Sequence, residues 1–193
     1  MSRLAADFTK FSQVHTNRIN LAIHFLFVPQ IFLAIFGILV HFSQIESLQF
    51  LPIGIDFILF GLLTIAYLLI DVTVGVLTSL WVFGLLVAAR VIYNHAVLSG
   101  IVTQVVKMFY GQIFICLLML IIGQKEFEGR LISSHLMHLL TIARDPIYIT
   151  TLALKLLGFR KGFFLEIEHA TDEARKSQEM LEEKLNQVVV ELK

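Results

Sequence analysis

The sequence predicts an all-α membrane protein: a multi-span bundle of transmembrane helices, with re-entrant or interfacial helices and an amphipathic helix at the C-terminal end. Of the 193 residues, 57% are hydrophobic and only 16% are charged, and the mean hydropathy is +0.81. Average soluble chains are about 45–50% apolar and about 25% charged. In addition, several apolar stretches approach the ~20 residues that a helix needs to cross a bilayer core.

Charge divides the chain into two parts, a transmembrane, catalytic-like domain at 1–160 and an acidic amphipathic helix at 161–193. Residues 1–165 carry 11 Lys/Arg and 7 Asp/Glu, a net charge of +4, and residues 166–193 carry 4 and 8, a net charge of −4. A mildly basic body suits a protein that faces anionic membrane lipids. The sequence has no basic stripe of the kind that nucleic-acid-binding proteins carry. The single cysteine, Cys116, excludes a disulfide framework.

Four apolar stretches are the expected spans. They cover Leu21–Val40, about Ile53–Ile70, about Val72–Ala89 and about Met108–Ile122. Asp71 separates the second from the third, and one helix across both would far exceed the bilayer, so these two are expected to form a tight hairpin. The run from Leu21 is too long for a cleavable leader, so we expect it to be retained as a span.

A fifth apolar stretch, Leu136–Leu157, is interrupted at its middle by Arg144, Asp145 and Pro146. Charges at the bilayer centre cost about 2.5–3.5 kcal/mol each on insertion scales, and proline breaks the helical hydrogen-bond ladder. We therefore expect two short helices that lie at the interface or re-enter the membrane.

Four spans place both termini on one side of the membrane. The basic residues near the two ends then share that face: Lys10, Arg18, Arg160 and Lys161. The loop 41–52 has no Lys or Arg, so the positive-inside rule predicts cytoplasmic termini, although Arg90 and Lys107 fall on the opposite face. The membrane is expected to be a bacterial inner membrane or the endoplasmic reticulum.

The acidic C-terminal segment has a heptad-like stripe, with alternating spacings of four and three. Its members are Ala174, Gln178, Leu181, Leu185, Val188 and Leu192. Such an a/d stripe of under three heptads fits two structures. One is a solvated helix that packs on the body, and the other is a coiled coil that makes the chain a homo-oligomer.

Polar residues gather where the first span begins. Polar side chains inside apolar helices are costly and need a reason. Asn17, Asn20 and His24 are spaced at i, i+3 and i+7, so they share one helix face. His15 lies nine residues before His24, which puts it on the opposite face, roughly 13 Å along the axis. A straight helix therefore cannot bring both histidines to one metal ion. Either the helix breaks between them, or only one of them is a ligand, or they serve different sites.

A second polar set follows the fourth span. It contains Gln124 and Glu128 at i, i+4 and His135 and His138 at i, i+3. Histidine and carboxylate ligands with open positions are typical of non-haem iron sites, and a histidine pair near a membrane interface is also often a hydrogen-bonding face. No Gly-rich phosphate loop, nucleophile elbow or His-Glu-x-x-His is present, which argues against nucleotide use and against serine or zinc hydrolysis.

These residues resemble a family. The string His15-x-Asn17-x-x-Asn20-x-x-x-His24, followed by Pro29, resembles the N-terminal signature of the 2-hydroxy fatty acid dioxygenases, small multi-span proteins known from yeast phytosphingosine breakdown and with bacterial relatives. The segment 122–130 is similar to the second signature, a Gly-His pair followed by Phe-Glu-Gly and a basic residue. The stretch 138–158 looks like the closing segment, so the resemblance covers about residues 11–158.

The resemblance implies oxidative removal of one carbon from a long-chain 2-hydroxy fatty acid with Fe²⁺ and O₂. It implies iron ligands at His15 and His24, with Glu128 beside them. With Gln124, at a family ligand position, and His138, a possible substitute, the candidate metal ligands are His15, His24, Gln124, Glu128 and His138. Glu128 is expected as a ligand or as a partner of one, and Asn17 and Asn20 are expected to orient ligands or to bind the polar head of the substrate.

The chain departs from the family pattern at Gln124, where the family has histidine, and an amide oxygen is a weaker iron ligand than imidazole. His135 or His138 could substitute for the missing ligand. The alternative function is therefore a catalytically inactive relative that binds membrane lipid or scaffolds partners. A small transporter fits less well, because no inverted repeat is evident.

Overall fold

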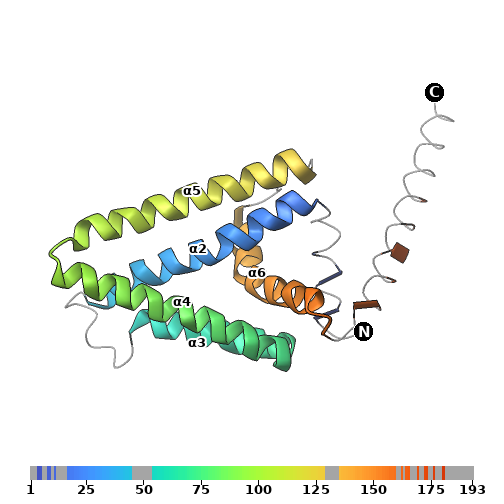
Figure 1. Ribbon diagram of the computed structural model, residues 1–193, viewed down its shortest axis with the longest axis horizontal. Helices are drawn as coiled ribbons and strands as arrows, with labels where there is room; N and C mark the ends of the chain where they lie inside the picture. Colours follow the sequence, from blue (N-terminus) through green and yellow to red (C-terminus); the bar gives the residue numbers. More distant parts are fainter. Residues whose placement is uncertain are drawn as a thin grey trace.

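The computed structural model describes residues 4–5, 8–9, 11, 17–44, 54–128 and 135–159 and isolated positions between 162 and 180, with side chains except at 128 and 135–141. This part of the chain is all-helical, which confirms the predicted fold class. The helices are α2 (Arg18–Ser43), α3 (Ile55–Ile70), α4 (Val72–Leu98), α5 (Val102–Glu128) and α6 (His135–Leu156) (Figure 1).

Three of these helices are long and apolar enough to cross a membrane: α2, α4 and α5. They have 26, 27 and 27 residues, about 40 Å of helix against a hydrocarbon core of ~30 Å. The fourth expected span, α3, is apolar but has only 16 described residues. Bulky apolar side chains cover the outside, for example Leu62, Leu80 and Phe114 with 61%, 63% and 69% exposure. A surface of this kind requires lipid around it, so the protein is embedded in a membrane.

Helices α2 to α5 run in alternating directions, with α2 between α5 on one side and the α3–α4 pair on the other (Figure 1). The starts of α2 and α4 and the ends of α3 and α5 therefore lie at the same end of the bundle. Helix α6 lies at that end and packs against α2, α3 and α4. The alternation thus gathers the first polar set, the second polar set and α6 at one end.

The predicted hairpin at Asp71 is confirmed. The Asp71 backbone N–H donates to the Tyr67 carbonyl at 3.2 Å, closing α3, and its side chain accepts from the Val74 N–H at 3.0 Å, capping α4. A Cβ at Gly75 would lie 2.6 Å from the Tyr67 carbonyl oxygen. Only glycine lets the first turn of α4 approach the last turn of α3 so closely.

The prediction of two short helices around Pro146 was wrong, because α6 is one helix from His135 to Leu156 with Pro146 inside it. Proline removes one backbone hydrogen bond and perturbs the preceding turn. Here the Tyr67 hydroxyl donates to the Ala143 carbonyl in that turn at 2.9 Å, and Asp145 and Ile147 on either side of the proline are buried in the bundle. Tertiary contacts therefore hold the helix continuous.

Helices α4 and α5 also extend beyond their predicted limits, to Leu98 and from Val102 to Glu128. Arg90 does not end α4, because its charge is paired with Asp56 of α3. The C-terminal stripe at 174–192 lies outside the described residues, so the two alternatives for that segment stay predictions.

Candidate functional site

The two polar sets of the sequence meet at the end of the bundle where α2 begins and α5 ends. Asn20 and His24 lie on the inward face of α2, Gln124 lies near the end of α5, and Asp145 lies in the middle of α6. All four are buried, with exposures of 0%, 6%, 7% and 1%. A Cβ at Gly123 would lie 2.7 Å from Asn20 Oδ1, so the α5 backbone touches the Asn20 amide.

A buried ion-pair geometry joins His24 to Asp145. His24 Nδ1 lies 3.2 Å from Asp145 Oδ2, and the two side chains are 7% and 1% exposed. An ionised carboxylate only accepts hydrogen bonds, so in a neutral imidazole the hydrogen is assigned to Nδ1 and Nε2 keeps its lone pair. A carboxylate on one ring nitrogen fixes the tautomer and orientation of the ring, the usual arrangement of a histidine that binds a metal or accepts a proton.

Aromatic side chains cover this pair. The Phe11 ring meets the His24 ring edge-on at 6.4 Å between centroids and stacks on Tyr148 of α6 at 4.5 Å. Phe8 contacts Tyr148 and Phe164, each at 6.3 Å. An apolar cover lowers the local dielectric constant, which strengthens hydrogen bonds to the charged carboxylate.

Hydrogen bonds from α3 and α4 fix the position of α6 and therefore of Asp145. The Trp81 indole N–H donates to Thr150 Oγ1 at 2.8 Å, and Thr78 Oγ1 lies 2.9 Å from the same oxygen. Thr150 in turn donates to the Pro146 carbonyl at 2.9 Å. With the bond from Tyr67 to Ala143, these contacts anchor the turn that carries Asp145.

The predicted site residues have different outcomes. Asn20 and His24 share the inward face of α2, and Gln124 is buried in α5 next to Gly123, where the α5 backbone contacts Asn20. Asn17 is the N-cap of α2, and its side chain accepts from the Ile19 N–H at 2.8 Å. His15 lies outside the described residues. Glu128 is the last residue of α5, and His135 and His138 fall in the first turn of α6. The side chains of these three residues are outside the described set.

The iron site therefore stays a prediction. Among the described side chains, no three His, Cys, Asp or Glu residues are grouped so that they could hold a metal ion. Of the five expected ligands, however, only His24 and Gln124 have described side chains. The described groups at this end of the bundle are the His24 imidazole with its carboxylate partner and the buried amides of Asn20 and Gln124. These groups suit Fe²⁺ as part of a larger ligand set.

Sequence reasoning missed Asp145, which it treated as an interruption of an apolar stretch. An ionisable residue within an apolar helix marks a functional site by default, and this signal could have identified Asp145. Its partner could not have been identified in this way, because His24 lies 121 positions away in the sequence.

A second buried polar cluster lies at the opposite end of the bundle. Asp56 is 0% exposed and accepts from Arg90 Nε at 2.8 Å and from Ser43 Oγ at 3.0 Å. The ion pair with Arg90 is also close, with Nη2 at 2.7 Å from Asp56 Oδ2. The Arg90 guanidinium also lies over the Phe57 ring, 4.3 Å from its centroid. Because both carboxylate oxygens are satisfied, this cluster joins α2, α3 and α4 structurally.

Comparisons of the chain with protein-family models, with curated protein sequences and with solved structures found no match. The fold and the site together define a class, a helical membrane protein with a buried histidine–carboxylate pair at one end of its bundle.

Proposed function

We propose that this protein is an Fe²⁺- and O₂-dependent dioxygenase that shortens long-chain 2-hydroxy fatty acids by one carbon. The observation that carries the proposal is the buried His24–Asp145 pair, in which a carboxylate oxygen lies 3.2 Å from Nδ1. A carboxylate in this position orients a metal-binding imidazole, and Nε2 would be the ligand atom. The likeness of segments 15–29 and 122–130 to the signatures of that family supports it.

The residues at the site fit such chemistry. His24 would hold the iron through Nε2, and Asp145 would keep the imidazole in the required orientation. The bound Fe²⁺ would supply the activation of O₂. The Asn20 and Gln124 amides would bind the carboxylate and the 2-hydroxyl group of a substrate, and the Phe11 ring covers the His24 ring.

The position of the site suits an amphiphilic substrate. It lies at the polar end of long apolar helices, so the headgroup of a fatty acid would reach the buried amides while its tail lies along the hydrophobic bundle. The pair would thus act at the boundary between lipid and water, where 2-hydroxy fatty acids reside.

The test is oxygen uptake by purified protein with 2-hydroxypalmitate and added Fe²⁺, with mass spectrometry of the shortened product. His24→Ala should lose both bound iron and oxygen uptake. Asp145→Asn should bind iron about 10–100-fold more weakly, the usual effect of losing the partner of a ligating histidine. His95→Ala is the matched control, because His95 is exposed on α4. Folded wild-type protein without iron-dependent uptake, or unchanged uptake in His24→Ala, would refute the proposal.

A second candidate function is lipid binding or scaffolding without turnover. Gln124 favours it, because this buried amide stands where the resembled family has an imidazole. Purified protein that folds normally, carries no iron and retains lipid would support this candidate. Gln124→His discriminates further, since a site that lacks only this ligand should gain stoichiometric iron on that substitution.

A further inference from the structure

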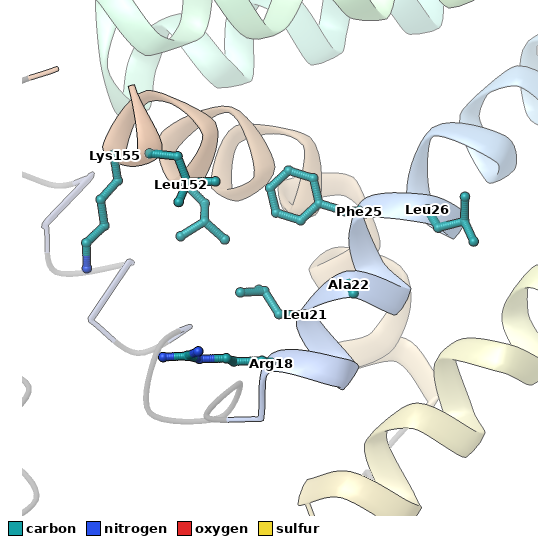
Figure 2. A pocket seen from close by; sticks show the side chains of 8 residues that line it. Arg18, Leu21, Ala22, Phe25, Leu26, Leu152 and Lys155 are labelled. Carbon is teal, nitrogen blue, oxygen red and sulfur yellow. The ribbon is translucent and has the colours of Figure 1, made fainter. Parts of the chain in front are cut away.

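A large open groove runs between the first half of α2 and the second half of α6. Its volume is about 1060 Å³, just above the ~300–1,000 Å³ typical of small-molecule pockets. Its walls are apolar: Leu21 and Phe25 come from α2, and Leu152 comes from α6. Figure 2 shows these side chains between the two helices. The groove is therefore wide and hydrophobic enough to hold a hydrocarbon chain.

Two basic residues stand at one end of this groove. Arg18 is the first residue of α2 and is exposed, and Lys155 lies in the last turn of α6. Figure 2 shows both side chains extending to the same side of the groove. None of the described residues that line it is acidic. One end of the groove therefore attracts an anion and the rest attracts an apolar chain.

We propose that this groove binds one anionic phospholipid of the surrounding bilayer. Its phosphate lies between Arg18 and Lys155, and an acyl chain lies along Leu21, Phe25 and Leu152. The occupant is a membrane lipid because the outer edges of the groove are exposed apolar residues, Leu26 at 59% and Leu156 at 80%, which lipid rather than water must cover. Arg18 begins the long apolar helix α2, and a basic residue at that position lies at the headgroup level.

The proposed lipid differs from the substrate of the proposed dioxygenase. Arg18 precedes His24 by six residues, about 9 Å along the helix axis, and its side chain leads further toward the N-terminal end. A carboxylate held by Arg18 would not place the neighbouring 2-hydroxyl group at the His24 ring. The groove is therefore a second site, and it does not depend on the iron chemistry.

The charges set the expected selectivity. A Lys or Arg near an anionic membrane surface contributes about 1 kcal/mol, which corresponds to about fivefold in affinity. With two basic residues, we expect the protein to prefer phosphatidylglycerol over phosphatidylcholine with identical chains by about 25-fold. The preference should fall as ionic strength rises.

The experiment is native mass spectrometry of the full chain in detergent, titrated with each of the two lipids. Arg18→Gln/Lys155→Gln should abolish the preference for phosphatidylglycerol. Ala22→Phe places a ring in the groove and should weaken the binding of both lipids. The matched control, Lys107→Gln/Lys125→Gln, removes two exposed charges from α5 and should keep the preference.

Equal binding of the two lipids by the wild type overturns the proposal, as does a preference that survives Arg18→Gln/Lys155→Gln. Soluble glycerophosphoglycerol at matched concentration should compete poorly. If it competes as well as the lipid, the site binds free phosphate groups and the proposal fails. Oxygen uptake should not change in Arg18→Gln/Lys155→Gln, so a failure here is separable from a failure of the dioxygenase proposal.

Discussion

Removing the Arg90 charge should strongly destabilise the bundle, because it leaves the Asp56 carboxylate buried without its cation. Asp56 is 0% exposed, accepts a hydrogen bond from Arg90 Nε and lies 2.7 Å from Arg90 Nη2. Breaking a buried ion pair by removing one partner costs about 3–5 kcal/mol. The Arg90 side chain is 34% exposed, so water can reach the vacated space and partly solvate the carboxylate. We therefore expect Arg90→Met to cost about 3 kcal/mol, the lower end of that range.

Thermal unfolding in detergent measures this effect. For a chain of this size, 1 kcal/mol corresponds to roughly 2–4 °C in melting temperature, so Arg90→Met should melt about 6–12 °C below the wild type. Asp56→Asn/Arg90→Met should recover much of the loss, because the amide still accepts from Ser43 and no charge is buried. Lys107→Met is the control for removing an exposed cation.

Two results would refute this reasoning. One is a shift in Arg90→Met no larger than that in Lys107→Met, which would mean that the carboxylate is not desolvated. The other is a double variant whose loss equals the sum of the two single losses. Additivity would show that the Asp56 and Arg90 side chains do not interact.

Two further predictions concern helix contacts. A Cβ at Gly37 would overlap the Phe109 ring, whereas one at Gly84 meets nothing within 4 Å. Gly37→Ala should therefore lower the free energy of unfolding by about 1–3 kcal/mol. An equal loss in Gly84→Ala would contradict the packing of Gly37 against Phe109. Thr150→Val removes the acceptor of the Trp81 indole N–H and should cost about 1–3 kcal/mol. The emission of Trp81, the single tryptophan, should shift in that variant, while Thr150→Ser should leave both quantities near wild type.

Some features could be read locally, residue by residue. The hairpin at Asp71 follows from two apolar runs too long to be one span, and the structure places the carboxylate as the cap of α4. The shared inward face of Asn20 and His24 follows from helical periodicity, and both are buried. Helix ends were less predictable. Charged residues such as Arg90 and Lys125 stay helical, because partners or exposed positions accommodate them.

The sequence by itself determined the membrane class, the order of the apolar helices and the polar face at the start of α2, because each depends on composition and periodicity over a few turns. Only the tertiary structure decided that α6 continues through Pro146 and that Asp145 faces His24. The two side chains are 121 positions apart, so their meeting depends on how α2 and α6 pack across the bundle, which no local pattern encodes. The groove between α2 and α6, with Arg18 and Lys155 in its lining, arises from the packing of the same two helices.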